Sequence, residues 1–362
     1  MNVVWSGCFA TRAMAIVPLV WVAVTAAGQL PPEPTVRSHD FAGIAPAPRD
    51  EDGRFRNPGG PIVQAGPSVT LPFFARRVAA RFRTPIGLPH SVAVDVQPLD
   101  STHVPTATWL GHATVLIQMA GIAFLTDPNW SQTAGPTPVT GAARLVDPPI
   151  ALEALPPIDF VLLSHNHYDH LDLPTLRQLA DLNPELVLFA PLGHTDLLRK
   201  VGAAQIVEMD WGQWVEFAAV RVHCLPARHW SRRGLFDMQR SLWSSWAVTS
   251  DEHRFFFAGD TAAFDGFRAI GRALGPFDLA ALPIGAYEPV AMMKDSHLNP
   301  EEAAAASREL RSRRSLAIHY GTFDLSDEPQ DEPPRRFREA MAANGSADES
   351  IWIVGIGESR VF

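Results

Sequence analysis

The sequence predicts a layered α/β domain. Short apolar runs of strand length, such as DFVLL and SLAI, recur along most of the chain, and patterns with helical spacing of leucine or alanine stand between them. The composition, 46% hydrophobic and 19% charged over 362 residues, supplies enough apolar surface for a sizeable core. Strands and intervening helices in one chain bury their apolar faces against each other in layers.

The first 28 residues differ from the rest. Arg12 precedes an apolar run, Ala13 to Ala27, and small residues and prolines follow. This pattern is typical of a secretory signal peptide, and the run is shorter than the roughly 20 residues that span a membrane. We therefore expect export to a periplasmic or extracellular location, with a retained membrane anchor as the alternative. Cleavage would remove Cys8 and leave Cys224 without a disulfide partner.

Residues 29–90 are expected to precede the main domain. The part up to Pro67 is rich in proline, glycine, arginine and aspartate, which predicts an extended leader. Phe73 and Phe74, followed by several arginines, predict a short basic helix. We expect its charges to be solvated, with contact to anionic lipid headgroups as the weaker alternative.

The main domain, residues 91–362, alternates strand and helix signals. Two helices have clear starts: Asp172 is a candidate N-cap, and Asn299 can cap a helix whose first residue is Pro300. Two or three strands are expected in 107–128, with a turn near Ala120 and Gly121. Further strands are expected within 159–165, 185–191, 221–229, 244–250, 253–260, 278–286, 315–321 and 350–359.

The densest chemical signal is the segment SHNHYDHLD, which directly follows the apolar run DFVLL. His165 and His167 are two residues apart and could point the same way from an extended loop, and Asp169 and His170 could serve a second ion. Imidazole and carboxylate ligands suit zinc, and also iron or manganese in a mixed site. A chance polar cluster is the alternative.

Three more polar residues stand at or after the ends of apolar strands: His229, Asp260 and His319. Each alone is more often structural than a ligand. Because strand ends converge on one rim in α/β folds, their joint occurrence favours a shared site.

The motif HNHYDH resembles the HxHxDH signature of the metallo-β-lactamase superfamily. The strings WLGHAT, FLTDP, RFFFAGDT, GPFDLAALPIGAYEP and AIHYGTF extend the match, and together they resemble the family of phospholipases D that hydrolyse N-acylphosphatidylethanolamine. The resemblance runs from about residue 105 to the C-terminus. It implies a four-layer αβ/βα sandwich with two zinc ions at one edge of its β-layers.

The resemblance also implies a ligand set. One ion would be held by His165, His167 and His229, and the other by Asp169, His170 and His319, with Asp260 bridging both. Two such ions can share a hydroxide that attacks phosphorus, and they can stabilise the charge that develops on its oxygens. Neither a serine nor a cysteine nucleophile is needed, so Cys224 is expected in the core.

Other residues are expected around the ligands. Asp127 could orient a ligand histidine through its free ring nitrogen, and His112 could do the same or be structural. His297 lies in a segment that in the family reaches the active site, where it could bind the phosphate or assist the leaving group. Arg233 and its neighbour Arg232 could pair with phosphate, with solvated surface charges as the alternative. Ser296 is a further candidate substrate contact, but it stands where mammalian-type members carry a glutamine, so their recognition of the headgroup does not transfer directly.

The expected activity is hydrolysis of N-acylphosphatidylethanolamine to phosphatidic acid and an N-acylethanolamine at a membrane surface, by a monomer or a homodimer. Segments 234–238 and 289–293 place Leu, Phe and Met near the site, where they could meet acyl chains or, as we slightly prefer, pack into the core. Hydrolysis of another ester, such as a lactone or a cyclic phosphodiester, is the alternative, and a non-enzymatic metal-binding protein is a third. The net charge of −9 disfavours nucleic acid as a partner.

Overall fold

A computed structural model describes residues 34–39, 41, 43–80, 82, 86–94, 104–137 and 140–362. The expected signal segment, residues 1–28, lies outside the described residues, and its interpretation stays a prediction. In the part of the chain that is described, no helix combines the length and the hydrophobicity needed to cross a membrane.

One sheet has the strand order β1-β10-β11-β12-β13-β14-β15-β16. Its strands are antiparallel from β1 to β13 and parallel from β13 to β16. Their bounds are β1 Arg37–Ser38, β10 Gln213–Phe217, β11 Val220–Leu225, β12 Ser245–Thr249, β13 Arg254–Phe257, β14 Leu279–Pro283, β15 Ser315–Ile318 and β16 Ile351–Trp352.

The second sheet has the order β17-β2-β3-β4-β7-β8-β9. It is antiparallel from β17 to β4 and parallel from β4 to β9. Its strands are β17 Ser359–Val361, β2 Thr106–Gly111, β3 Thr114–Met119, β4 Ile122–Thr126, β7 Phe160–Leu162, β8 Val187–Pro191 and β9 Gln205–Met209, and a separate hairpin joins β5 Thr133–Thr137 to β6 Thr140–Ala143.

The two large sheets pack face to face because alternate residues of their strands point inwards. In β4, Phe124 belongs to the core between the sheets, whereas its neighbour Leu125 belongs to a second cluster on the outer face. The Phe124 ring lies 5.9 Å from the ring of Phe255 in the facing sheet. Strands covered on both faces read as continuous apolar runs, which explains why the strand signals are so clear in the sequence.

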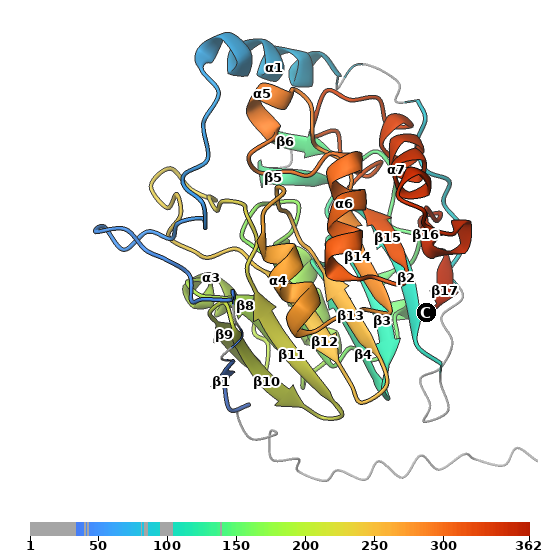
Figure 1. Ribbon diagram of the computed structural model, residues 1–362. Helices are drawn as coiled ribbons and strands as arrows, with labels where there is room; N and C mark the ends of the chain where they lie inside the picture. Colours follow the sequence, from blue (N-terminus) through green and yellow to red (C-terminus); the bar gives the residue numbers. More distant parts are fainter. Residues whose placement is uncertain are drawn as a thin grey trace, which may run out of the picture. The chain divides into compact units, whose positions relative to one another are not determined.

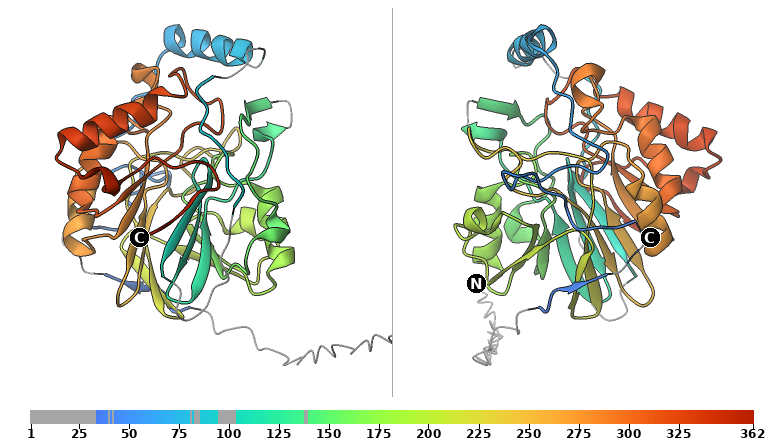
Figure 2. Two further views of the ribbon diagram at one scale, coloured as in Figure 1. Left: turned by 90° about the vertical axis from the view of Figure 1, so that its right-hand side faces the viewer. Right: turned by 60° about the vertical axis from the view of Figure 1, so that its left-hand side comes forward.

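Helices cover both outer faces (Figures 1 and 2). Leu176 and Leu179 of α2 pack on the outer face of the seven-stranded sheet, while Phe267 of α4 and Phe337 of α7 pack on the other sheet. The predicted four-layer αβ/βα sandwich is therefore confirmed. The helices are α1 Pro67–Ala80, α2 Leu173–Leu182, α3 Thr195–Leu198, α4 Gly266–Ala273, α5 Val290–Met293, α6 Pro300–Leu310 and α7 Glu332–Ala343, with 3₁₀ turns η1 Leu152–Ala154 and η2 Asp348–Ser350.

Both predicted helix starts are present, but only one has a capping hydrogen bond. Asn299 accepts a hydrogen bond from the Glu302 amide and Pro300 is the first residue of α6, as expected. Asp172 does stand at the N-cap of α2, but its carboxylate makes no capping bond. It accepts hydrogen bonds from the hydroxyls of Ser131 and Thr175 instead. The predicted N-cap position is therefore confirmed, although these hydroxyls occupy the carboxylate in place of the helix N–H groups.

The described residues between 34 and 66 pack against the domain and do not form the leader that we expected. Strand β1 pairs with β10 at the edge of the eight-stranded sheet, and Ile44 and Phe55 are buried. The backbone is mostly extended, as the proline content suggests, but its few apolar residues are enough to fix it on the sheet.

The predicted basic helix is α1, and two of its arginines face the protein. Arg76 and Arg77 both form ion pairs with Asp327, and Arg77 also pairs with Asp324. The exposed side of α1 is apolar instead: Leu71 and Phe74 are 68% and 57% exposed. The expectation of solvated charges is therefore wrong for Arg77, whose side chain is 20% exposed, whereas the side chain of Arg76 is 50% exposed.

Candidate metal centre

The polar residues that follow the strands meet at one edge of the sandwich. Parallel strands place their carboxyl ends together, and β4, β7, β13 and β15 all end in loops that carry candidate site residues. The segment that follows β7, Ser164 to Asp172, is called the metal loop below. The residues brought together are Asp127, His165, His167, Asp169, His170, His229, Asp260, His297 and His319.

Three ring nitrogens form the first donor group. The Nε2 atom of His165 lies 2.7 Å from Nδ1 of His167, which lies 3.2 Å from Nε2 of His229. His165 and His229 are fully buried. Three nitrogens this close can hold one cation.

Two histidines and a carboxylate form the second donor group. The Nε2 atoms of His170 and His319 are 3.2 Å apart. The Oδ2 atom of Asp169 lies 3.3 Å from the first and 3.6 Å from the second. This group can hold a second cation through two nitrogens and one oxygen.

Asp260 stands between the two groups. Its carboxylate oxygens lie 3.1 Å from His170 Nε2 and 3.0 Å from His319 Nε2, and also 3.8 Å from His229 Nε2 and 4.0 Å from His165 Nε2. The Oδ1 atom is buried and forms no hydrogen bond, although His319 is so near. When His319 is neutral, as a metal ligand must be, this buried oxygen has no donor, which is costly, and a cation would satisfy it.

In His170 and His229, the hydrogen bond of Nδ1, which points away from the centre, determines that Nε2 faces the centre. Nδ1 of His229 is 2.8 Å from the carbonyl oxygen of Ser296, and Nδ1 of His170 is 2.6 Å from a carboxylate oxygen of Asp127. Each Nδ1 must donate to its acceptor, so the lone pair of each Nε2 is directed inwards. These residues therefore fit bound metal ions.

The pKa shifts indicate which residues of the centre are neutral and which are charged. Burial lowers the pKa of His165 and His229 well below 6.5, so both rings are neutral, as metal ligands must be. Burial acts to raise the pKa of Asp260, but His170 and His319 outweigh it and hold that pKa well below 3.8. Burial also acts to lower the pKa of His319, and Asp260 and Asp169 overcome it and raise the pKa to about 9. Without metal, protons on His170 and His319 thus balance two buried carboxylates.

Asp127 and His112 both orient residues of the centre, in different ways. Asp127 accepts hydrogen bonds from His170 Nδ1 and from the backbone N–H of Ser164, so it orients a histidine as predicted. His112 Nε2 lies 2.9 Å from Asp169 Oδ2, so it orients a carboxylate and not a histidine. His112, Asp127 and His319 have φ values of 50°, 33° and 63°. Backbone strain of this kind is often found at functional sites.

His297 lies at the rim of the centre. Its Nδ1 is 3.8 Å from Asp260 Oδ2, and its ring centroid is 5.1 Å from that of His229. Burial lowers its pKa to about 4, and 13% of its side chain remains exposed. The neutral ring can therefore reach a molecule that enters the site.

The substrate contacts expected for Arg233 and Ser296 do not match the structure. Arg233 Nη1 donates to the backbone carbonyls of Asn166 and Leu171, and the guanidinium stacks 4.0 Å from the Tyr168 ring centroid, so Arg233 braces the metal loop. Ser296 is buried, and its hydroxyl donates to the Met293 carbonyl. Both assignments were wrong because each side chain is turned into the protein.

The core packing preferred for two apolar segments is also wrong in part. Leu235 and Phe236 are 78% and 89% exposed, and Val290 of α5 is exposed as well, whereas Met293 is buried. Cys224 is buried in the core, as predicted.

Sequence reasoning missed two contacts of the first donor group. The Trp230 ring packs edge-on to His167, with centroids 4.4 Å apart, and follows His229 directly in the chain. Asn57 forms hydrogen bonds to the backbone of His229 from 172 residues away. Trp230 could have been found from its position beside His229, but no local signal points to Asn57.

Comparison with known proteins agrees with this arrangement. The family model described as "Beta-lactamase superfamily domain" matches residues 123–320. A metallo hydrolase from the archaeon Ignicoccus hospitalis has a similar fold, with a TM-score of 0.52, 21% identity and coverage of 72% of this chain and 99% of that chain. The fold and the donor groups thus define a metal-dependent hydrolase of the β-lactamase superfamily.

Two curated relatives narrow the assignment. The "N-acyl-phosphatidylethanolamine-hydrolyzing phospholipase D 1" of Caenorhabditis elegans is 43% identical over 264 residues, which cover 70% of this chain and 74% of the relative. The mitochondrial protein of that description from Saccharomyces cerevisiae is 30% identical over 371 residues, with coverage of 87% and 77%. The chain belongs to the N-acyl-phosphatidylethanolamine-hydrolysing phospholipase D family, which confirms the resemblance seen in its motifs.

Proposed function

We propose that this hydrolase cleaves N-acylphosphatidylethanolamine to phosphatidic acid and an N-acylethanolamine. The observation that carries the proposal is the 43% identity, over 264 residues, to a relative named for this reaction. The paired arrangement of the two donor groups supports it, because phosphoryl transfer is favoured by two neighbouring cations.

Two zinc ions are the proposed cofactors. His165, His167 and His229 would hold one ion, and Asp169, His170 and His319 the other, with Asp260 in contact with both. The donors are nitrogen and oxygen atoms with no sulfur, which suits zinc and also admits iron or manganese. When bound, the metals would lower the pKa of water and polarise the phosphoryl oxygens.

The chain's own residues would then orient the substrate. His297 is neutral at pH 7 and stands beside Asp260 at the rim, where it can form a hydrogen bond with the phosphate or with the leaving group. We propose it as a catalytic residue together with Asp260. Arg233 keeps the metal loop in place and has no substrate contact in this scheme.

A membrane surface is the proposed source of the substrate. Exposed apolar side chains occur on α1 at Leu71, Phe74 and Val78, and in the loop at Leu235 and Phe236. The spacing of the three on α1 puts them on one face of the helix. Such side chains can enter the boundary between headgroups and acyl chains.

Export, through the segment 1–28, and homodimer formation remain proposals that rest on the sequence alone. Analysis of the N-terminus by mass spectrometry would decide whether that segment is removed.

Product analysis tests the proposed reaction. Metal-reconstituted protein is incubated with N-acylphosphatidylethanolamine, phosphatidylcholine and a lactone, and the products are identified by mass spectrometry. We expect phosphatidic acid and N-acylethanolamine from the first substrate, and loss of both in a His165→Ala variant. Turnover of the lactone alone would overturn the proposal and leave another hydrolase activity of the same fold.

A further inference from the structure

Asn57 holds the backbone of His229 on both sides of the residue. Its Nδ2 donates to the His229 carbonyl oxygen at 2.7 Å, and its Oδ1 accepts from the His229 backbone N–H at 3.1 Å. The same Oδ1 accepts from Trp243 Nε1 at 3.1 Å. Asn57 is 5% exposed, so these bonds form away from water.

The partners fix the orientation of the Asn57 amide. Two N–H donors face Oδ1 and one carbonyl faces Nδ2, so the opposite orientation would place donor against donor and acceptor against acceptor. An aspartate at this position would keep both accepting bonds but would direct an anionic oxygen at the His229 carbonyl. Asparagine can therefore form all three hydrogen bonds, whereas aspartate, which has the same shape, cannot donate to the His229 carbonyl.

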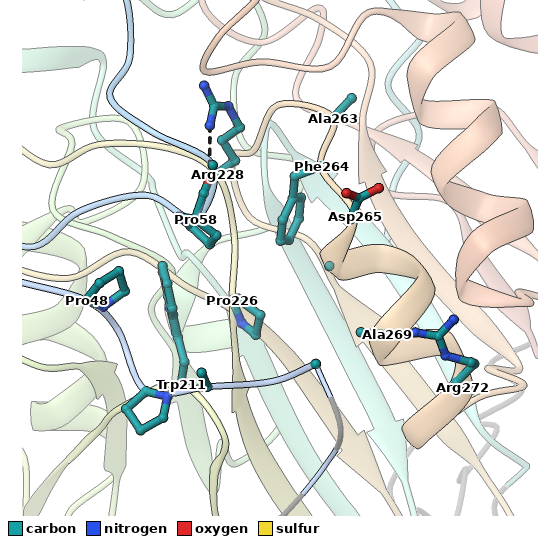
Figure 3. A pocket seen from close by; sticks show the side chains of 15 residues that line it. Pro48, Pro58, Trp211, Pro226, Arg228, Ala263, Phe264, Asp265, Ala269 and Arg272 are labelled. Atoms are coloured by element: carbon teal, nitrogen blue, oxygen red, sulfur yellow. Dashed lines mark hydrogen bonds between the residues drawn. The ribbon is translucent and has the colours of Figure 1, made fainter.

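The segment that contains Asn57, residues 57–60, also bonds to Arg228, the residue before His229. Arg228 Nη1 donates to the carbonyl oxygens of Pro58 at 3.1 Å and Gly60 at 3.4 Å, and Figure 3 shows the contact with Pro58. On one side of this segment lies a cavity of about 620 Å³, whose walls include Pro58, Arg228 and Phe264 (Figure 3). No residue of the two donor groups lines it. The segment is thus tied to residues 228 and 229 by hydrogen bonds at Asn57, Pro58 and Gly60.

His229 is held at three points. Asn57 fixes its N–H and its carbonyl, and the Ser296 carbonyl fixes Nδ1 of the ring. The two Asn57 bonds hold the backbone of His229, and the Ser296 bond restrains rotation of the ring, so that together they support the 3.2 Å separation of Nε2 from His167 Nδ1.

We infer that Asn57 is a positioning residue for the first donor group, so that the segment before α1 completes the metal centre. The inference rests on the proposed function only in taking His229 as a ligand. Asn57 lies upstream of the residues that match the superfamily model, 123–320. Second-sphere partners of metal ligands typically change metal affinity by about 10- to 100-fold when replaced.

The test compares Asn57→Asp and Asn57→Ala with a matched control in the full-length chain. Asn183 bridges two backbone groups in the same way, since Oδ1 accepts from the Ile158 N–H and Nδ2 donates to the Leu179 carbonyl, both at 2.8 Å. It lies at the end of α2 remote from the metal loop. Zinc affinity by competition with a chelator, the Co²⁺ absorption spectrum and the melting temperature of the metal-free protein are measured for every variant.

We expect both Asn57 variants to bind one of two zinc ions about 10- to 100-fold more weakly and to alter the Co²⁺ spectrum. Asn183→Ala should lower the melting temperature without changing either metal readout. Wild-type affinity and spectrum in Asn57→Asp would overturn the inference, and so would an equal loss of affinity in Asn183→Ala. If Asn57→Ala does not fold, the isosteric Asn57→Asp variant alone decides.

A His229→Ala variant separates the two proposals. If it loses no zinc, the proposed ligand set fails. If it loses an ion while the Asn57 variants do not, only the positioning role of Asn57 fails.

Discussion

Replacing Asp260 with asparagine tests the centre of the proposed site most directly. The change keeps the shape of the side chain and removes one negative charge. In the structure that charge lies 3.1 Å from His170 Nε2, 3.0 Å from His319 Nε2 and 3.8 Å from His229 Nε2. It is therefore the carboxylate that contacts both donor groups.

The expected magnitude follows from the charges. Two divalent cations would bring four positive charges to a buried site. Asp260→Asn removes one of the negative charges that oppose them and gives a poorer bridging ligand, so at least one ion should bind more weakly. Turnover should fall by at least about 100-fold, or roughly 2.7 kcal/mol of activation free energy.

The assay measures turnover on N-acylphosphatidylethanolamine, zinc content and thermal melting on one preparation of the variant. Folding should survive because Asp260 lies in a loop at the edge of the sandwich. Near-normal turnover with two bound ions would refute the bridging role. In that case Asp260 would be a turn residue, a place that asparagine fills equally well.

Three further outcomes are expected. Asp127→Asn should weaken metal binding about 10- to 100-fold, because Asp127 orients a histidine of the metal loop, and chelator competition would show it. The metal-free protein should lose stability as pH rises from about 6.5 to 9, because the pKa of His319 is raised to about 9 in the folded state. The stabilising effect of the His319 proton is complete below about pH 6.5 and is lost as the pH passes about 9. Melting curves across this range would reveal the loss. The double change Leu71→Ser and Phe74→Ser should reduce sedimentation with phospholipid vesicles, whereas Leu182→Ser on α2, also exposed, should not; equal sedimentation of both would contradict a role for α1 at the membrane.

The sequence was most informative where function depends on a local motif or on a strand end. His165, His167, Asp169 and His170 lie within six residues of each other directly after a strand, so the loop alone brings them together. His319 follows another parallel strand, whose end must lie at the same edge. Side-chain identity and strand topology were sufficient for these positions.

Prediction failed where the direction of a side chain decides its role. Arg233 follows His229 closely in the sequence, which suggested a contact with phosphate. Its guanidinium instead donates to backbone carbonyls of the metal loop. Leu235 and Phe236 are of the apolar types that usually form a core, yet both are exposed in a loop. Asn57 has no signal at all, because its partner His229 is 172 residues away and the contact is made with backbone atoms.

The donor groups come from loops of both large sheets. The metal loop follows β7 of the seven-stranded sheet, whereas His229, Asp260 and His319 follow strands of the eight-stranded sheet. Each bound ion would thus act as a cross-link between the two halves of the sandwich, and separating the halves would require its release. By mass action, free metal at 100 times its dissociation constant would add about 2.7 kcal/mol to the free energy of unfolding. The supply of metal would then govern how long the folded protein survives, as well as how fast it turns over its substrate.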